Sequence, residues 1–226
     1  MYCAGCEPGA RRVGRVSCPF SFIGPRRHRA AGVRWEGLPP IDVALLSHNH
    51  YDHLAMPTLR RLRDRGAAQF VLPAGVGGLL GSQRTGPVFE LDWGESVSLG
   101  AIAVHSVPTL HFSGRGLFDR NRTLWCGYVI EAAHQTIYFA GDTGFGPHFA
   151  QIRERFGPPR LALLPIGASE PRWFMAPVHM ARASRCTTGR SKWPMKVSIR
   201  REQRLRESLA GDAFLVLHNG ESAILE

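Results

Sequence analysis

Short apolar runs separated by polar loops recur through the middle of the chain. The run Ile41–Ser47 (IDVALLS) follows two prolines and consists largely of β-branched and leucine residues, a pattern typical of a buried strand. In Met56–Arg65, Leu59 and Leu62 lie three positions apart among charged residues, and Pro57 stands in the first turn. This spacing predicts an amphipathic helix. The local order is therefore strand, polar loop and helix.

The alternation continues to about residue 165. Short apolar runs that end in turns predict further strands, and one longer amphipathic segment predicts a second helix. The predicted strands are Gln69–Leu72, Ser96–Leu99, Ile102–Val107, Trp125–Glu131, Gln135–Ala140 and Leu161–Pro165, and the predicted helix is Phe149–Phe156. Strands that alternate with helices indicate an α/β protein whose sheets are covered by helices.

The positive charge of the chain is unevenly distributed. The 226 residues carry a net charge of +10, of which residues 1–34 hold +6 and residues 181–206 hold +8, while residues 35–180 are neutral. A nucleic-acid-binding domain usually has basic residues interleaved with aromatic ones on its own folded face. We therefore expect no nucleic-acid partner.

The cysteines and the hydropathy of the sequence indicate the cellular compartment of the protein. Five cysteines are an odd number, which argues against a complete disulfide framework and favours a reducing compartment. Cys3 and Cys6 form one CxxC pair, but a zinc ribbon needs a second pair. No stretch approaches the roughly 20 apolar residues of a spanning helix, and the first residues lack the apolar core of a secretory signal. We expect a cytoplasmic protein that can also bind a membrane peripherally.

The strongest chemical signal is the hexapeptide HNHYDH at His48–His53, between the first predicted strand and helix. Three imidazoles and a carboxylate in six residues match the nitrogen and oxygen ligands that zinc and related ions prefer. His111 and Asp142 each follow a later predicted strand, and either alone could equally be structural. Together with the hexapeptide they become candidate ligands from other strand ends.

These motifs resemble the metallo-β-lactamase superfamily, and within it the family of N-acyl-phosphatidylethanolamine-hydrolysing phospholipases D. The resemblance covers about residues 19–180 and 207–226. It rests on SHNHYDHL (Ser47–Leu54), RGLFDRNRTLW (Arg115–Trp125), FAGDTGF (Phe139–Phe145), PIGASEPRWFM (Pro165–Met175) and FLVLHNGESAIL (Phe214–Leu225).

The resemblance implies a four-layer αββα sandwich with two zinc ions. By this resemblance one zinc binds to three histidines, and the other zinc binds to an aspartate and a histidine. A further aspartate bridges the two ions. Both aspartates take part in catalysis. The residues are His48, His50 and His111 for the first zinc, Asp52 and His53 for the second, and Asp142 as the bridge. His179 matches a histidine that lines the family's active site, so we expect it to contact substrate.

Two segments depart from the family pattern. Residues 1–18 do not resemble the strands with which the family begins, so we divide the chain into a divergent segment 1–18 and a hydrolase domain 19–226. The basic segment Ala181–Arg206 stands where the family has a helix, a strand and a further zinc-binding histidine. The sandwich is therefore expected to be incomplete at both places and the second zinc site to lack one ligand. A shifted reading frame across residues 181–206 is one hypothesis for this departure.

The function that the resemblance implies is hydrolysis of N-acyl-phosphatidylethanolamine to phosphatidate and an N-acylethanolamine by a hydroxide between the two zinc ions. The substrate lies in a bilayer, and Arg26, Arg27 and Arg29 near Phe20 and Phe22 are candidates for docking on it. Two alternative functions stay open: a hydrolase of a soluble ester or phosphodiester, and a non-catalytic remnant with one zinc or none. A homodimer is a possible assembly of the chain.

Overall fold

The computed structural model describes residues 35–65, 69–81, 86–133, 135–165, 175, 177 and 178. Predictions for residues 1–34 and 181–226 therefore lie outside the described residues. They include the segment boundary at residues 18 and 19, the arginine cluster at residues 26–29 and the departure at residues 181–206.

The first half of the described chain forms a parallel three-stranded sheet. Its strands are β1 (Val43–Leu45), β2 (Gln69–Pro73) and β3 (Val88–Leu91), in that spatial order. Parallel neighbours need a crossover connection, and helices α1 (Met56–Asp64) and α2 (Gly77–Leu80) lie in the two connections. A short 3-10 turn at Trp35–Gly37 precedes the sheet.

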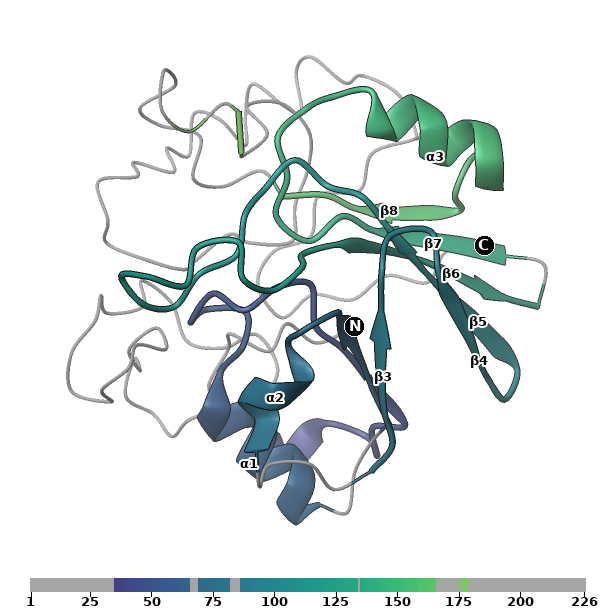
Figure 1. Ribbon diagram of the computed structural model, residues 1–226. Coiled ribbons are helices and arrows are strands. Elements are labelled where there is room, and N and C mark those ends of the chain that lie inside the picture. The colour runs from purple at the N-terminus through teal and green to yellow at the C-terminus, as the bar shows by residue number, and fades with distance from the viewer. Residues whose placement is uncertain are drawn as a thin grey trace, which may run out of the picture.

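The second half forms a five-stranded sheet. Strands β4 (Ser96–Leu99), β5 (Ile102–Val107), β6 (Gly127–Ala132) and β7 (Gln135–Phe139) are antiparallel neighbours. Helix α3 (His148–Phe156) then leads to β8 (Leu161–Leu163), which pairs in parallel with β7. Figure 1 shows the two sheets side by side, with α1 and α2 outside the first and α3 outside the second.

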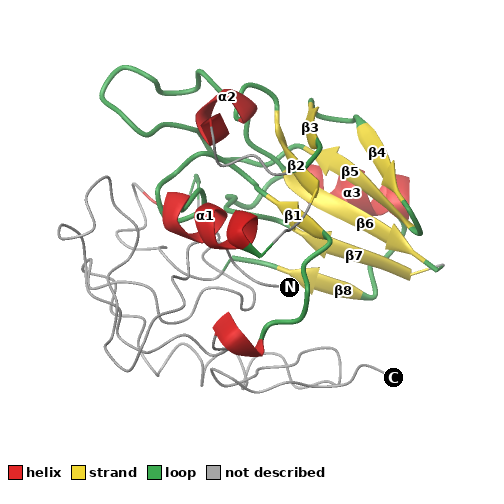
Figure 2. Ribbon diagram, turned by 90° about the horizontal axis from the view of Figure 1, so that it is seen from below, coloured by secondary structure: helices red, strands yellow, loops and turns green. Residues whose placement is uncertain are grey.

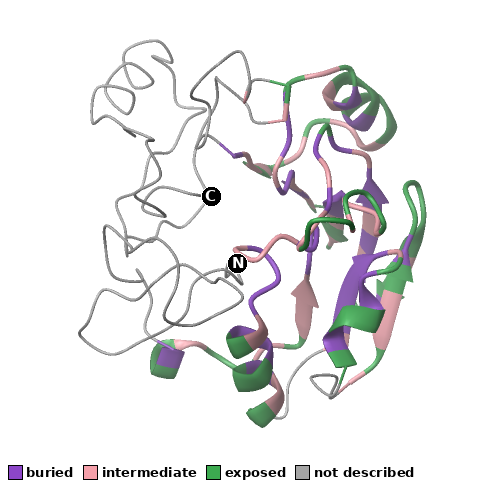
Figure 3. Ribbon diagram, turned by 60° about the vertical axis from the view of Figure 1, so that its left-hand side comes forward, coloured by how far each residue is buried: buried purple, intermediate pink, exposed green. Residues whose placement is uncertain are grey.

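Three apolar clusters fill the three spaces between these four layers. The first joins α1 to the parallel sheet through residues such as Leu59 and Phe70. The second lies between the sheets and contains Val71 and Tyr128, and the third joins the five-stranded sheet to Ile152 of α3. Figure 2 shows the helical layers outside the sheets, and Figure 3 shows buried residues gathered in the strands. The predicted αββα sandwich is thus confirmed for the described residues.

Most predicted elements are confirmed with small changes in length, and three elements were missed: strand β3, helix α2 and the 3-10 turn at Trp35–Gly37. Strand β1 is shorter than the predicted Ile41–Ser47, because the residues after Leu45 leave the strand to form the polar loop. Strand β3 and helix α2 have four residues each. Helix α2 begins with Gly77 and Gly78, residues that disfavour helix, so local propensity does not reveal it.

The sheet topology brings three connections to one edge. Strands β5 and β7 run in the same direction because both are antiparallel to β6 between them. Their carboxyl ends therefore meet at one edge of the sheet, where β6 begins. The Tyr128 hydroxyl in β6 donates to the Leu46 carbonyl, at 2.8 Å, just after β1, and Cys126 N donates to Ser47 O at 2.8 Å. The ends of β1, β5 and β7 are consequently held together.

Candidate metal centre

The loop Ser47–Leu54, which we call the ligand loop, carries the HNHYDH motif directly after β1. The backbone N–H groups of His53 and Leu54 both donate to the His50 carbonyl, at 3.0 and 2.8 Å, so the loop folds back on itself before α1. This turn lets three imidazoles gather on one side. The ring centroid of His48 lies 4.5 Å from that of His50 and 4.0 Å from that of His53.

Two further connections add a donor each to this cluster. His111 follows β5, and its ring centroid is 4.7 Å from that of His48. Asp142 follows β7, and its Oδ2 lies 3.0 Å from Nε2 of His53. The possible ligand atoms fall into two overlapping groups, each within 4.8 Å: His48, His50 and His111, and His48, His53 and Asp142. Five predicted ligands from three strand ends are thus brought together.

The close approach of the Asp142 loop to the ligand loop requires glycine at position 141. Gly141 has a φ of +62°, and a Cβ added there would lie 2.8 Å from Cβ of Ser47. A larger residue would meet both a strained backbone and a steric clash. Gly141 therefore allows the carboxylate of Asp142 to reach the imidazoles.

The donor atoms suit a divalent metal ion. Nε2 of His48 is buried and makes no hydrogen bond in the described part of the structure, while Nδ1 of the same ring lies 3.0 Å from the Ser47 hydroxyl. A buried ring nitrogen without a partner is costly in a protein interior, and a metal ion would satisfy it. Burial, followed by the neighbouring His53 and His111, lowers the pKa of His48 well below 6.5. The ring is therefore neutral at pH 7, as a ligand must be.

His111 has the orientation of a metal-binding imidazole as well. Its Nδ1 lies 3.1 Å from the carbonyl oxygen of Val178, and because a carbonyl only accepts hydrogen bonds, Nδ1 carries the hydrogen. The lone pair of Nε2 then faces the cluster, where Nδ1 of His50 is 3.3 Å away. A backbone carbonyl behind the ring fixes the tautomer of many ligating histidines.

Asp142 is the more buried of the two candidate carboxylates. Its side chain is 13% exposed, whereas that of Asp52 is 42% exposed. Burial by itself raises the pKa of Asp142, but His53, His48 and His111 outweigh it and hold the pKa well below 3.8. Oδ2 of Asp52 lies 3.7 Å from Nε2 of His53 and belongs to neither of the two described donor groups. The binding of Asp52 to a metal stays a prediction, and His179 lies outside the described residues.

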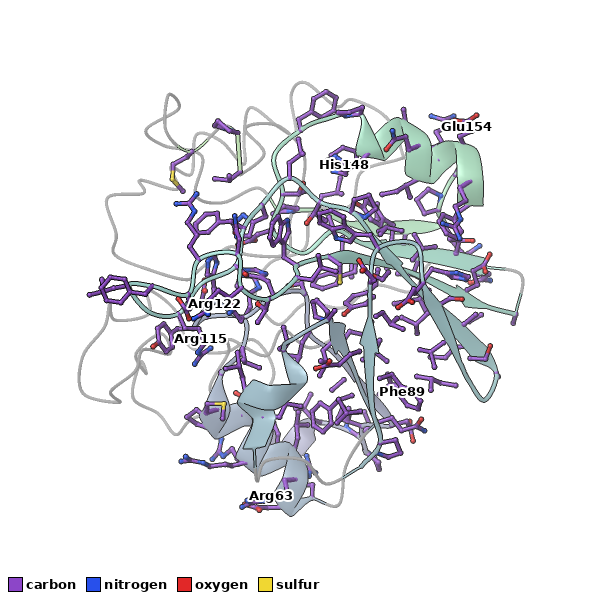
Figure 4. All side chains as sticks on the ribbon, viewed as in Figure 1. Arg63, Phe89, Arg115, Arg122, His148 and Glu154 are labelled. Atoms are coloured by element: carbon purple, nitrogen blue, oxygen red, sulfur yellow. The ribbon has the colours of Figure 1, made fainter. Side chains whose placement is uncertain are left out.

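Several supporting residues were not found from the sequence. Nη1 of Arg115, on the loop between β5 and β6, donates to the carbonyls of Asn49 and Leu54 at 2.7 and 3.0 Å. The guanidinium also stands 4.0 Å from the ring centroid of Tyr51. Arg115, labelled in Figure 4, thus contacts the ligand loop near its start and at its end. It lies in one of the resembling motifs, but only the fold shows what it contacts.

A second support joins the loops of His111 and Asp142. The Thr143 hydroxyl oxygen accepts from the Leu110 backbone N–H at 3.0 Å and lies 3.2 Å from Nε2 of His148. Gly144 N also donates to Leu110 O at 2.8 Å. His148, at the start of α3 in Figure 4, is buried. It keeps the two connections in contact.

The metal-free protein is expected to lose stability as the pH falls from about 6.5. The folded state keeps His48 neutral because burial depresses its pKa, whereas the unfolded chain takes up a proton near the ordinary value of 6.5. Stability is therefore fully present above pH 6.5 and falls as protons bind the unfolded state, by at most about 1.4 kcal/mol per pH unit for one group. Burial lowers the pKa of His148 in the same direction.

Chemical denaturation of the chelator-treated protein between pH 7.5 and 5 would measure this slope. In His48→Gln the slope is expected to be smaller, because that side chain does not titrate. A matched substitution at the more exposed His105, which pairs with Glu131 at 2.7 Å, controls for the loss of a histidine elsewhere. Equal slopes in the wild type and His48→Gln would contradict the role given to His48.

Comparisons with known proteins agree with this geometry. The family model of the beta-lactamase superfamily domain matches residues 16–190. The chain belongs to this superfamily, and the resemblance seen in its motifs is confirmed.

Two of the similar proteins have names that concern hydrolysis. The chain is 40% identical over 171 residues to N-acyl-phosphatidylethanolamine-hydrolyzing phospholipase D 1 of Caenorhabditis elegans, an alignment of 71% of this chain and 48% of that protein. The chain thus spans about half the length of that relative. It is 28% identical over 186 residues to a metal-dependent hydrolase of Thermococcus onnurineus, covering 78% of this chain and 79% of that one. These relatives support the expectation of a hydrolase.

A solved structure shows the same fold. The isothiocyanate hydrolase from Delia radicum gut bacteria matches with a TM-score of 0.52 and 19% identity, over 74% of this chain and 66% of that chain. At this identity the match concerns the architecture alone.

Proposed function

We propose that this chain is a metal-dependent hydrolase that uses zinc to cleave the phosphodiester of N-acyl-phosphatidylethanolamine, as a phospholipase D. The observation that carries the hydrolase proposal is the convergence of four imidazoles and the Asp142 carboxylate from the ends of β1, β5 and β7. The name of the C. elegans relative supports the lipid substrate. The mixed nitrogen and oxygen donor set supports zinc.

His48, His50, His53, His111 and Asp142 would hold the metal, with Asp52 as a further ligand of the second ion. When bound, two zinc ions lower the pKa of water and offset the negative charge of a phosphoryl group. The chain's own residues position the reaction. Buried imidazoles and the apolar core behind them exclude bulk water from one side of the cluster, so the substrate approaches from the side where the three connections end.

Asp142 stands beside a second candidate ligand, His53. Their atoms Oδ2 and Nε2 are 3.0 Å apart. In the proposed reaction Asp142 orients the attacking water and takes its proton, and the half-exposed Asp52 passes that proton on to solvent. The bond from phosphorus to the ethanolamine oxygen breaks, and this oxygen takes up a proton from solvent as it leaves. Because water rather than a side chain attacks phosphorus, no serine or cysteine nucleophile is required. Cys126 suits no such role, because burial raises the pKa of its thiol to about 12.

The experiment that tests this proposal follows product formation by the zinc-reconstituted protein on vesicles that contain N-acyl-phosphatidylethanolamine. Mass spectrometry should detect N-acylethanolamine and phosphatidate in equal amounts. In water enriched in oxygen-18 the label should enter the phosphatidate, because attack at phosphorus leaves the ethanolamine oxygen unlabelled. Prior treatment with a chelator should abolish both products, and added zinc should restore them.

The alternatives give different results in the same preparation. Hydrolysis of a soluble chromogenic diester without any action on the lipid would overturn the lipid substrate and keep the hydrolase. One zinc per chain or none after reconstitution, together with no activity on either substrate, would indicate a non-catalytic remnant.

A further inference from the structure

The loop Gly114–Arg122, which we call the finger loop, exposes two large apolar side chains to solvent. Leu117 is 92% exposed and Phe118 is 90% exposed, more than any other large apolar side chain in the described residues. Two adjacent side chains of this size would normally be at least partly covered. Figure 1 shows their loop, between β5 and β6, extending beyond the ends of these strands.

The finger loop is a built turn. The Asp119 carboxylate accepts hydrogen bonds from the backbone N–H groups of Arg115 and Gly116, at 3.0 and 2.7 Å. Asn121 closes the turn with a φ of +57° and a bond from its N–H to the Ser113 carbonyl at 2.9 Å. A turn with this many internal bonds presents Leu117 and Phe118 at its tip in a fixed way.

The base of the finger loop contacts the metal centre. Gly114 N donates to the Asn49 side-chain oxygen of the ligand loop, at 2.6 Å. The Phe112 ring lies 4.7 Å from that of His50 and 4.9 Å from that of His111, between centroids. On the neighbouring connection Phe145, three residues after Asp142, is 77% exposed. Exposed apolar side chains therefore stand on two of the connections that carry the candidate ligands.

Positive charge flanks the apolar tip. The loop contains Arg115, Arg120 and Arg122 against one acidic residue, Asp119. Arg120 and Arg122 are exposed, and the Arg120 guanidinium is 4.5 Å from the Phe112 ring centroid. An apolar tip with basic residues beside it matches the chemistry of a bilayer surface, where acyl chains lie beneath anionic phosphates.

The shape of the finger loop favours lipid over a protein partner. A stable protein interface buries roughly 800 Å² on each partner, usually over a broad surface. Two side chains at the tip of a protruding turn offer far less area. A fluid bilayer, in contrast, surrounds a protruding tip on all sides and so buries both side chains completely.

We propose that the finger loop docks this protein on a phospholipid bilayer. Leu117 and Phe118 insert among the acyl chains, and Arg120 and Arg122 contact the phosphates of anionic headgroups. This places the metal centre at the membrane surface, within reach of a phosphodiester in the headgroup layer. The proposal rests on the proposed function, because this orientation serves catalysis only if the substrate is a lipid.

The first test measures binding of the zinc-loaded full chain to sedimenting vesicles of phosphatidylethanolamine and phosphatidylserine. The double variant Leu117→Ser/Phe118→Ser is expected to bind about 30-fold more weakly, because most of the apolar transfer free energy is lost. Arg120→Glu/Arg122→Glu is expected to lose about 30-fold on these vesicles and much less on neutral ones. Arg60→Glu/Arg153→Glu, on exposed positions of α1 and α3, makes the same change in net charge and should bind like the wild type.

A second measurement does not depend on loss of binding. Subtracting the tryptophan emission spectrum of the wild type from that of Phe118→Trp gives the emission of the introduced indole. On vesicles this emission should shift to the blue, and lipids brominated in their acyl chains should quench it. An unshifted, unquenched signal from the introduced indole on bound vesicles would overturn insertion of the tip. Equal binding by the wild type and the serine double variant would overturn the docking role in the same way.

The outcomes separate docking from the proposed function. Tip-dependent vesicle binding without lipid hydrolysis would keep the docking surface and reject the substrate. Hydrolysis of the lipid in detergent micelles by a protein that does not bind vesicles would keep the function and overturn docking. Self-association that the serine variant removes, without vesicle binding, would show that the tip contacts a second copy of the chain and would also overturn the proposal.

Discussion

Replacing Asp142 with asparagine is expected to lower hydrolytic activity about 10³-fold and to reduce the zinc content of the reconstituted protein. Asparagine has nearly the same shape but removes the negative charge that faces the imidazoles of His53, His48 and His111. It also removes the atom that accepts a proton from the attacking water. A loss of about 10³ corresponds to about 4 kcal/mol of transition-state stabilisation, which is reasonable for a charged group at the reacting centre.

Elemental analysis and lipid hydrolysis should be measured on the same preparations. We expect about two zinc ions per chain in the wild type and fewer in Asp142→Asn. The matched control is Asp64→Asn on α1, where the carboxylate is 62% exposed and pairs with Arg63. That variant should keep both zinc and activity. Unchanged metal content and full activity in Asp142→Asn would remove Asp142 from the centre.

The ligand loop shows why the candidate site could be predicted largely from the sequence. Its donors lie within six consecutive residues, so their proximity follows from a single turn between β1 and α1. His111 and Asp142 were harder, because their approach depends on strands β5 and β7 running in the same direction on either side of β6. Here the family resemblance supplied what spacing alone left open.

The supports behind the ligands could not be predicted, because they depend on contacts between segments far apart in sequence. Arg115 is 61 residues from Leu54, whose carbonyl it contacts, and 66 residues from Asn49. A glycine-rich segment with arginines predicts a loop but does not indicate where its side chains point. The contact between His111 and the Val178 carbonyl could not be predicted either, because every residue has a carbonyl and the sequence does not indicate which one lies beside the ring.

The fold itself was predictable where packing and local pattern agree. Leu59 and Leu62 indicate the buried side of α1, and both pack in the cluster beneath the parallel sheet. Helix α2 was not predictable because two of its four residues are glycine and its position is set by the sheet. There Gly77 N donates to the Glu90 carboxylate of β3, a tertiary contact that no local pattern contains.

Replacing Arg115 with methionine is expected to weaken zinc binding by 10- to 100-fold, a loss of about 1.4 to 2.8 kcal/mol. Methionine keeps an apolar stem of similar length, so the main loss is that of the two hydrogen bonds to Asn49 and Leu54. Those bonds hold the start and the end of the ligand loop. Without them the imidazoles sample orientations that do not bind metal, and part of the binding free energy is used to order them. Competition with a chelator of known affinity measures the change.

Arg115→Lys separates charge from geometry, because lysine restores the positive charge but presents a single ammonium in place of the planar guanidinium. We expect Arg115→Lys to recover only part of the zinc affinity. The lysine side chain has a different length, and its single nitrogen would have to donate to both carbonyls and also contact the face of the Tyr51 ring. Arg122→Met, at an exposed position on the same loop, is the matched control and should bind zinc like the wild type. If Arg115→Met also bound zinc like the wild type, the ligand loop would be ordered by its own turn at His50, and the guanidinium would contribute only to packing.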